Sequence, residues 1–193
     1  MIIDCHAHLV PPSLLEAIRA QAVSFPSIRL IEDGGSLGFS FAGGKPTRPV
    51  SKPLSDLPGR LKWMDEQNIE RQVVGGWLDM FGYEVPAEEG ANWSRLINTH
   101  LRQTAKREPR FVTLATVPLQ DGARAADAGD DPGIGVAGDV AGIDQPRHRD
   151  QRVGDAPDRI GHAVIMHAVI AAFEHGMDED HRFQLVGGFP ERL

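Results

Sequence analysis

Apolar residues recur along residues 1–126 with two different periods, and the two periods alternate along the chain. Short apolar runs predict strands at residues 1–10, 72–77 and 111–117. Apolar residues spaced three and four apart predict helices that begin at residue 13 and that cover residues 57–67 and 86–106. Strands that alternate with helices imply a mostly parallel sheet, so we expect an α/β fold.

Local signals predict where some of these elements begin and end. Ser13, with Glu16 three residues later, forms a capping-box pattern that places Ser13 at the N-cap of the first helix. Asn68 is expected to end the second helix in a left-handed conformation. Residues 26–56 are rich in glycine and proline and predict a long irregular loop, with a possible hairpin where apolar residues alternate over 37–41. A loop of this length inside a compact domain is often functional.

The chain changes character after residue 126. Residues 127–193 contain no Ser, Thr, Asn, Lys, Trp, Tyr or Cys, and residues 127–161 show neither a helical nor a strand period. One apolar run, at 162–173, is too short to cross a membrane. We therefore expect two parts: residues 1–126 as an α/β unit, and residues 127–193 as a low-complexity tail whose composition is typical of linkers and disordered segments.

Charge and composition exclude several classes of protein. The formal net charge is −7 and no basic patch is visible, which argues against a nucleic-acid partner. We find no membrane-spanning stretch and no signal peptide, so we expect a cytoplasmic protein with no membrane partner. Cys5 is the single cysteine, which excludes an intrachain disulfide and a cysteine-based zinc site. We expect it to be a small buried hydrophobe.

The chemistry is concentrated in the first predicted strand, which contains an Asp-x-His-x-His pattern. Side chains alternate along a strand, so His6 and His8 are expected on one face together with Asp4, while Cys5 takes the other face. Neutral imidazole is a usual nitrogen ligand of zinc. The sequence therefore predicts a metal site built on His6 and His8; the alternative is a strand end with two solvated histidines. Such a pair at the carboxyl end of a strand suits a (β/α) barrel.

Other candidate residues carry weaker predictions. From the residue alone, we expect Arg48 to be a solvated surface arginine; the alternative is that its guanidinium binds a substrate carboxylate with two parallel hydrogen bonds. His100 falls on the inner stripe of its helix and is expected to be a core histidine. A formal G-x-G-x-x-G at 133–138 lacks the preceding strand that a dinucleotide site needs, so we disfavour a nucleotide-binding module. The spacing of four further histidines does not predict a shared ligand site, although any one of them remains a candidate to complete the first-strand pair: His162, His167, His175 and His181.

Several segments occur in the order typical of one family. They are residues 3–8, 48–50, 60–65, 80–83, 93–98 and 117–121. Residues 1–126 thereby resemble the amidohydrolase superfamily, and within it the aminocarboxymuconate-semialdehyde decarboxylase branch (amidohydrolase family 2). The resemblance implies a (β/α)₈ barrel and a divalent metal, usually Zn²⁺. It also implies decarboxylation or hydrolysis of a small carboxylated substrate, with His6 and His8 as metal ligands, Arg48 gripping the substrate carboxylate, and residues 80–83 in a loop near the pocket.

The sequence departs from this family in its second half. The family's His-Pro and Gly-His-Gly-Gly motifs, which supply the remaining metal ligands and an acid–base histidine, do not occur here. A full barrel needs about 250 residues. We therefore expect a TIM-barrel-like (β/α) metal-dependent hydrolase fold truncated to its N-terminal half. Translation of residues 127–193 from another reading frame would explain the unusual composition of the tail. The function expected is that of an amidohydrolase-type decarboxylase or hydrolase; the alternative is a catalytically inactive fragment. Homo-oligomerisation stays open.

Overall fold

The computed structural model describes residues 2–20 and 24–129. The predictions made for 133–138, for 162–173 and for the four histidines of the tail lie outside the described residues. The elements, in chain order, are β1 (Ile3–Leu9), α1 (Pro12–Arg19), β2 (Ile28–Asp33), β3 (Ser36–Phe41), α2 (Lys52–Ser55), α3 (Leu57–Glu66), β4 (Arg71–Gly76), the 3₁₀ turn η1 (Leu78–Met80), α4 (Ala87–Arg107), β5 (Phe111–Thr113) and α5 (Gly122–Gly129).

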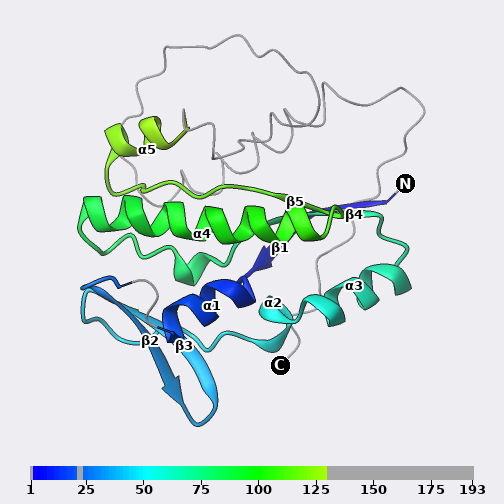
Figure 1. Ribbon diagram of the computed structural model, residues 1–193, viewed down its shortest axis with the longest axis horizontal. Helices are drawn as coiled ribbons and strands as arrows, with labels where there is room; N and C mark the ends of the chain where they lie inside the picture. Colours follow the sequence, from blue (N-terminus) through cyan, green and yellow to red (C-terminus); the bar gives the residue numbers. More distant parts are fainter. Residues whose placement is uncertain (1, 21–23, 130–193) are drawn as a thin grey trace.

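Three of the strands form a parallel sheet with β4 in the middle. The order is β1-β4-β5, and both pairings are parallel. Helix α4 runs along this sheet, while α1, α2 and α3 lie on the same side of it as the base of the β2–β3 hairpin (Figure 1). The predicted α/β fold with a parallel sheet is confirmed for residues 2–20 and 24–129. These residues do not close a barrel, and no helix among them is long and apolar enough to cross a bilayer.

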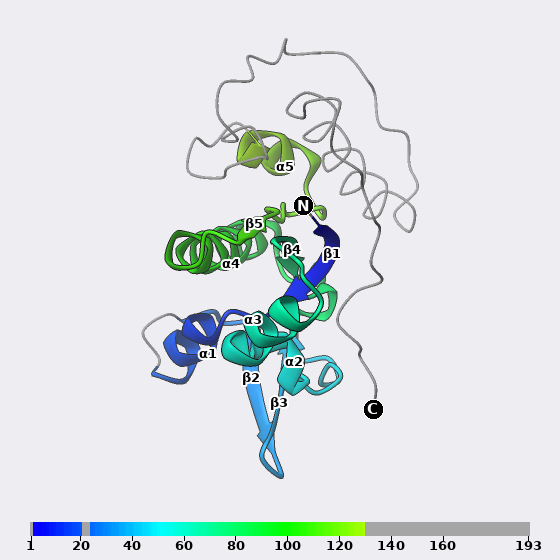
Figure 2. The same ribbon diagram turned by 90° about the vertical axis from the view of Figure 1, so that its right-hand side faces the viewer.

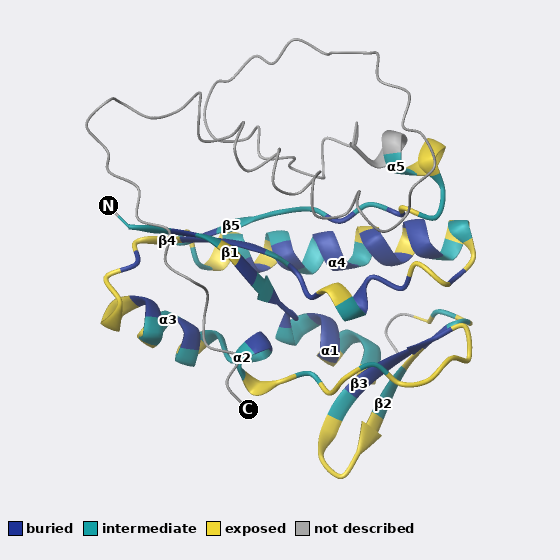
Figure 3. Ribbon diagram, turned by 180° about the vertical axis from the view of Figure 1, so that it is seen from behind, coloured by how far each residue is buried: buried dark blue, intermediate teal, exposed yellow. Residues whose placement is uncertain are grey.

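The hairpin corrects the prediction that residues 26–56 are irregular. β2 and β3 pair in antiparallel register from Ile28–Phe41 to Asp33–Ser36, as the alternation over 37–41 indicated for β3. The two residues between the strands, Gly34 and Gly35, have φ of 54° and 83°, a conformation that suits the tight turns of two-residue hairpins. The tip projects away from the sheet and is exposed, whereas the base is buried (Figures 2 and 3).

The core gathers where the hairpin base meets α4. Trp93 of α4 is fully buried, and its ring makes edge-to-face contacts with Phe25, Phe39 and Phe41 at centroid distances of 5.3, 6.0 and 6.3 Å. The inner stripe predicted for α4 is confirmed in most positions: Trp93, Ile97, Leu101 and Thr104 are buried, while Leu96 and His100 are half-buried. A continuous apolar cluster therefore joins the hairpin to the helix that supports the parallel sheet.

Two predicted boundaries are wrong. Helix α1 begins at Pro12 with Pro11 as its N-cap, so Ser13 lies inside the first turn and does not cap it. Strand β5 ends at Thr113, four residues earlier than predicted, because the backbone of Thr116 is bound by the side-chain amide of Asn98, not by a strand. The predicted end of α3 is confirmed, since Asn68, which follows the C-cap residue Gln67, has φ of 55°.

The hydroxyl of Ser13 contacts a histidine instead. Ser13 Oγ lies 2.8 Å from His100 Nδ1, which links α1 to α4, and burial lowers the pKa of His100. The folded state therefore binds a proton at His100 less readily than the unfolded chain, whose histidines titrate near pH 6.5. It follows that this residue makes the fold less stable as the pH falls below about 6.5.

Substitution of His100 by glutamine is expected to reduce that dependence on pH. Urea unfolding at pH 7.5 and pH 5.5 should show a smaller loss of unfolding free energy on acidification in His100→Gln than in the wild type. The difference between the two proteins isolates His100, because the other titrating groups are common to both. Equal losses in the two proteins would contradict the assignment.

Candidate metal centre

The faces of β1 are set by a shift in its pairing with β4. Asp4 pairs with Gln72 and Ala7 pairs with Val74, so β1 advances three residues while β4 advances two. Because the extra residue reverses the alternation of side chains, Asp4 and Ala7 both lie on the buried face. The prediction that Asp4 shares a face with His6 and His8 is therefore wrong.

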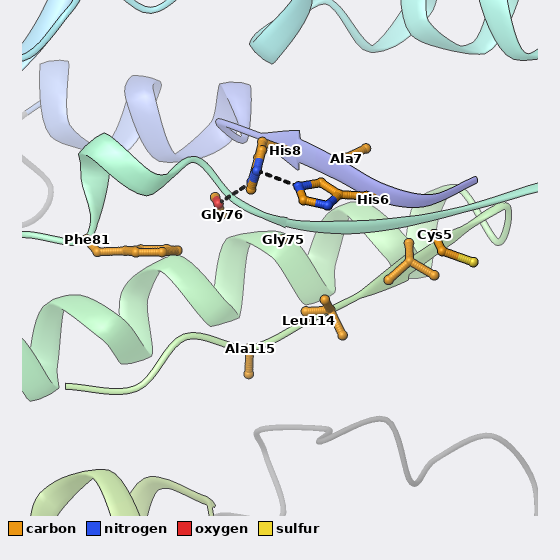
Figure 4. Close-up of a pocket in the computed structure, with 10 residues that line it drawn as sticks. Cys5, His6, Ala7, His8, Gly75, Gly76, Phe81, Leu114 and Ala115 are labelled. Carbon is orange, nitrogen blue, oxygen red and sulfur yellow. Dashed lines mark hydrogen bonds between the residues drawn. The ribbon is translucent and has the colours of Figure 1, made fainter. Parts of the chain in front are cut away.

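His6 lies within this shift and His8 follows it, and both lie on the opposite face of β1. Their Nε2 atoms are 3.2 Å apart, and the two rings meet edge to face with centroids separated by 5.1 Å (Figure 4). His6 is exposed and His8 is half-buried. The prediction that the two imidazoles lie side by side at the carboxyl end of a strand is confirmed.

The backbone of β4 orients the ring of His8. Its Nδ1 lies 3.0 Å from the carbonyl oxygen of Gly76. A carbonyl only accepts hydrogen bonds, so this contact requires a proton on Nδ1 and, in the neutral ring, leaves the lone pair on Nε2. Metal-binding histidines commonly donate their other ring nitrogen to a carbonyl in this way. The ring is thus turned so that its lone pair faces His6.

The two histidines line a pocket whose other walls are mostly apolar. Its remaining lining residues come from the three parallel strands and the segments that follow them: Cys5, Ala7, Val73, Gly75, Gly76, Phe81, Leu114 and Ala115. Cys5 alternates with the buried Asp4, and the register shift then brings His6 to the same side of the strand as Cys5 (Figure 4), so the prediction that Cys5 takes the opposite face is wrong. Burial, with a smaller contribution from Asp4, raises the pKa of the Cys5 thiol. The protonated thiol is a poor metal ligand and a poor nucleophile.

The pair fits part of a zinc site. Zinc binds imidazole nitrogen at about 2.0–2.1 Å in tetrahedral geometry, which places two such nitrogens about 3.3 Å apart. The observed 3.2 Å between the Nε2 atoms matches this separation. Catalytic zinc normally has three protein ligands. Within residues 2–20 and 24–129, no group of three or more His, Cys, Asp and Glu side chains is arranged to hold a metal.

Arg48 lies outside this set of lining residues. Its guanidinium makes two parallel hydrogen bonds to the carboxylate of Asp79, at 2.8 and 3.0 Å, and lies 6.0 Å from the centre of the Trp77 ring. The side chain is 72% exposed, which makes the contribution of this ion pair to stability small. Arg48 therefore binds a carboxylate with both prongs of its guanidinium, as predicted for a substrate, but here the carboxylate is that of Asp79.

Sequence reasoning missed a hydrogen-bonded network of three buried polar residues on the other face of β1. Arg60 of α3 is 2% exposed, and Gln72 of β4 and Asp4 of β1 are fully buried. Arg60 donates to Gln72 Oε1 at 2.9 Å, and Gln72 donates to Asp4 Oδ2 at 2.7 Å. One signal was available in the sequence. Position 60 falls on the apolar stripe formed by residues 57, 61 and 64, where a charged residue requires a buried partner.

Comparisons with known proteins find likenesses of structure. No family model matches the sequence, and no curated protein matches it. Among solved structures, the chain is similar to Metarhizium anisopliae IDCase (16% identity, TM-score 0.49), covering 72% of this chain and 39% of that one. It is similar to 5-carboxyvanillate decarboxylase from Sphingomonas paucimobilis (24% identity, TM-score 0.44, 65% and 37% covered). It is also similar to 2,6-dihydroxybenzoate decarboxylase from Rhizobium (20% identity, TM-score 0.43, 68% and 36% covered). The chain thus corresponds to less than two fifths of the length of each of these proteins.

Proposed function

We propose that His6 and His8 are the first two ligands of a divalent metal centre, with zinc the expected ion. The observation that carries the proposal is the convergence of their Nε2 atoms to 3.2 Å, with His8 oriented by the carbonyl of Gly76. When bound, such an ion supplies Lewis-acid chemistry: it lowers the pKa of a bound water and polarises substrate oxygen atoms.

The function proposed for the whole protein is that of an amidohydrolase-type decarboxylase or hydrolase of a small carboxylated substrate. The order of its motifs supports this proposal, since residues 3–8 and 80–83 both contribute to one structural region: His6, His8 and Phe81 line the same pocket. Arg48 is the proposed ligand of the substrate carboxylate. Arg48 already binds the carboxylate of Asp79 through two hydrogen bonds, which is the geometry proposed for the substrate. A substrate carboxylate would have to displace Asp79 from Arg48.

Metal titration of the purified full-length chain tests the proposal. We expect Zn²⁺ to bind the wild type with a stoichiometry near one and to raise its melting temperature, because a ligand that binds only the folded state stabilises it. In His6→Ala or His8→Ala the binding should fall to the level of a single surface histidine. Arg19→Ala, which removes an exposed residue outside the pocket, serves as the control and should bind like the wild type. Wild-type binding in His6→Ala would refute the site.

The second candidate is a catalytically inactive fragment of such an enzyme. The observation that favours it is that the described residues bring together two candidate ligands and not three. Two imidazoles hold zinc more weakly than three ligands do. In the titration, this candidate predicts that both the wild type and His6→Ala bind no zinc at micromolar concentration, and that metal does not change the melting temperature.

A further inference from the structure

The backbone on both sides of Ala7 is bound by side chains from the buried face of the sheet. On one side, the backbone N–H of His6 donates to Asp4 Oδ1 at 3.1 Å. On the other side, the carbonyl oxygen of His8 accepts from Arg60 Nη2 at 2.7 Å. Both peptide groups belong to the residues whose rings form the candidate metal centre.

These contacts occur where β1 loses its regular pairing. The register shift between Asp4 and Ala7 disrupts the ladder locally, and such irregularities often re-aim a side chain beside an active site. Without the shift, the alternation of side chains would place His6 on the buried face with Asp4. The position of the His6 ring therefore depends on the irregular segment keeping its shape.

Gln72 joins the two contacts into one chain of hydrogen bonds. It accepts from Arg60 Nη1 at 2.9 Å and donates to Asp4 Oδ2 at 2.7 Å, and it is fully buried. Arg60 also donates to the carbonyl oxygen of Pro53 at 2.9 Å, which fixes the guanidinium against the segment carrying α2. In a buried environment each member of such a network is costly to leave without its partners, so the whole chain holds one geometry.

We propose that Arg60, Gln72 and Asp4 are positioning residues that set the separation of the His6 and His8 rings. The network acts through the backbone: Asp4 fixes the peptide of His6, Arg60 fixes the peptide of His8, and Gln72 keeps the two in register. The zinc arm of the test below rests on the proposed metal centre; the arm without metal does not.

Two substitutions of the network separate positioning from folding. Gln72→Met keeps a side chain of similar length and removes both links. Arg60→Lys keeps the positive charge, but a single nitrogen cannot reach Gln72 and both carbonyls together. Arg110→Met is the matched control, because Arg110, like Arg60, donates to a side-chain oxygen (of Asp65) and to a backbone carbonyl (of Ile69, 2.7 Å), away from the histidine rings.

Three measurements are made on each full-length variant. Circular dichroism reports folding, competition with a chromophoric chelator reports Zn²⁺ affinity, and ¹H–¹⁵N spectra of the metal-free protein report the protonated nitrogen of each histidine. Gln72→Met and Arg60→Lys are expected to fold with lower melting temperatures, to bind Zn²⁺ about 10–100-fold more weakly, and to lose the single Nδ1-protonated form of His8. Arg110→Met is expected to lose some stability and to keep the wild-type affinity and histidine spectrum.

Each outcome decides the proposal. Folded variants with wild-type zinc affinity and wild-type histidine spectra would overturn it. Failure of both network variants to fold at low temperature would also overturn it, because the network would then serve the fold as a whole. If the wild type binds no zinc while the network variants lose the Nδ1-protonated form of His8, the proposed metal centre is refuted and the positioning role stands.

Discussion

Replacing Trp93 with alanine is expected to lower the free energy of unfolding by about 3–5 kcal/mol. The side chain is fully buried among three phenylalanine rings, so its removal leaves a cavity bounded by Phe25, Phe39 and Phe41. The substitution also removes the donor to the carbonyl oxygen of Met80, 2.7 Å from the indole nitrogen in a buried environment. Urea unfolding followed by circular dichroism measures the loss.

Two further variants separate the causes of that loss. Trp93→Phe keeps most of the ring volume and removes the indole N–H, so it should cost less than Trp93→Ala. Trp63→Ala truncates a tryptophan that is only partly buried at the edge of the core, and it should also cost less. A cost for Trp63→Ala equal to or above that of Trp93→Ala would contradict the central place given to Trp93.

Trp93 also connects the core to the candidate metal centre. The Met80 carbonyl that it binds is one residue before Phe81, whose ring forms a wall of the pocket. The hairpin base, α4 and the segment after β4 therefore meet at one side chain. This explains why a sequence motif at 80–83 and another at 93–98, separated along the chain, contribute to the same region.

Periodicity predicted the parallel sheet because its strands and helices differ in period and are separated by clear breaks. The apolar run at residues 72–77 and the apolar stripe of 86–106 could each be interpreted from the residues of one element alone. β2 was missed because its apolar residues at 28, 30 and 31 do not alternate strictly, and its partner strand supplies the pairing that stabilises it. A strand that is stabilised mainly by pairing with its partner is difficult to predict from its own sequence.

The placement of His6 and His8 side by side was predicted by alternation along β1, but the same alternation wrongly placed Asp4 and Cys5. Alternation holds only while the register is regular, and the register shift is a property of the pairing between β1 and β4. No pattern within residues 1–10 encodes it. The buried network of Arg60 was also unpredictable from local pattern, because Gln72, which Arg60 binds, and Asp4, which Gln72 binds, come from other elements.

Replacing Gly82 with alanine is expected to lower the free energy of unfolding by about 2–5 kcal/mol, for two reasons that add. Gly82 has φ of 65°, a left-handed conformation that costs an alanine about 1–2 kcal/mol. A Cβ at this position would lie 2.6 Å from two ring atoms of Phe41, and such overpacking costs about 1–3 kcal/mol. Phe41 is held in the core beside Trp93, so the ring cannot move away freely.

Gly43→Ala provides the matched control for the conformational part of that cost. Gly43 has φ of 73°, close to that of Gly82, but a Cβ there would meet nothing within 4 Å. Gly43→Ala should therefore lose only about 1–2 kcal/mol in the same urea unfolding experiment. The difference between the two variants measures the contact with Phe41, and equal losses would show that Gly82 is required by its backbone conformation alone. Because Phe81 precedes Gly82 and lines the pocket, a large difference also predicts weaker Zn²⁺ binding in folded Gly82→Ala than in Gly43→Ala.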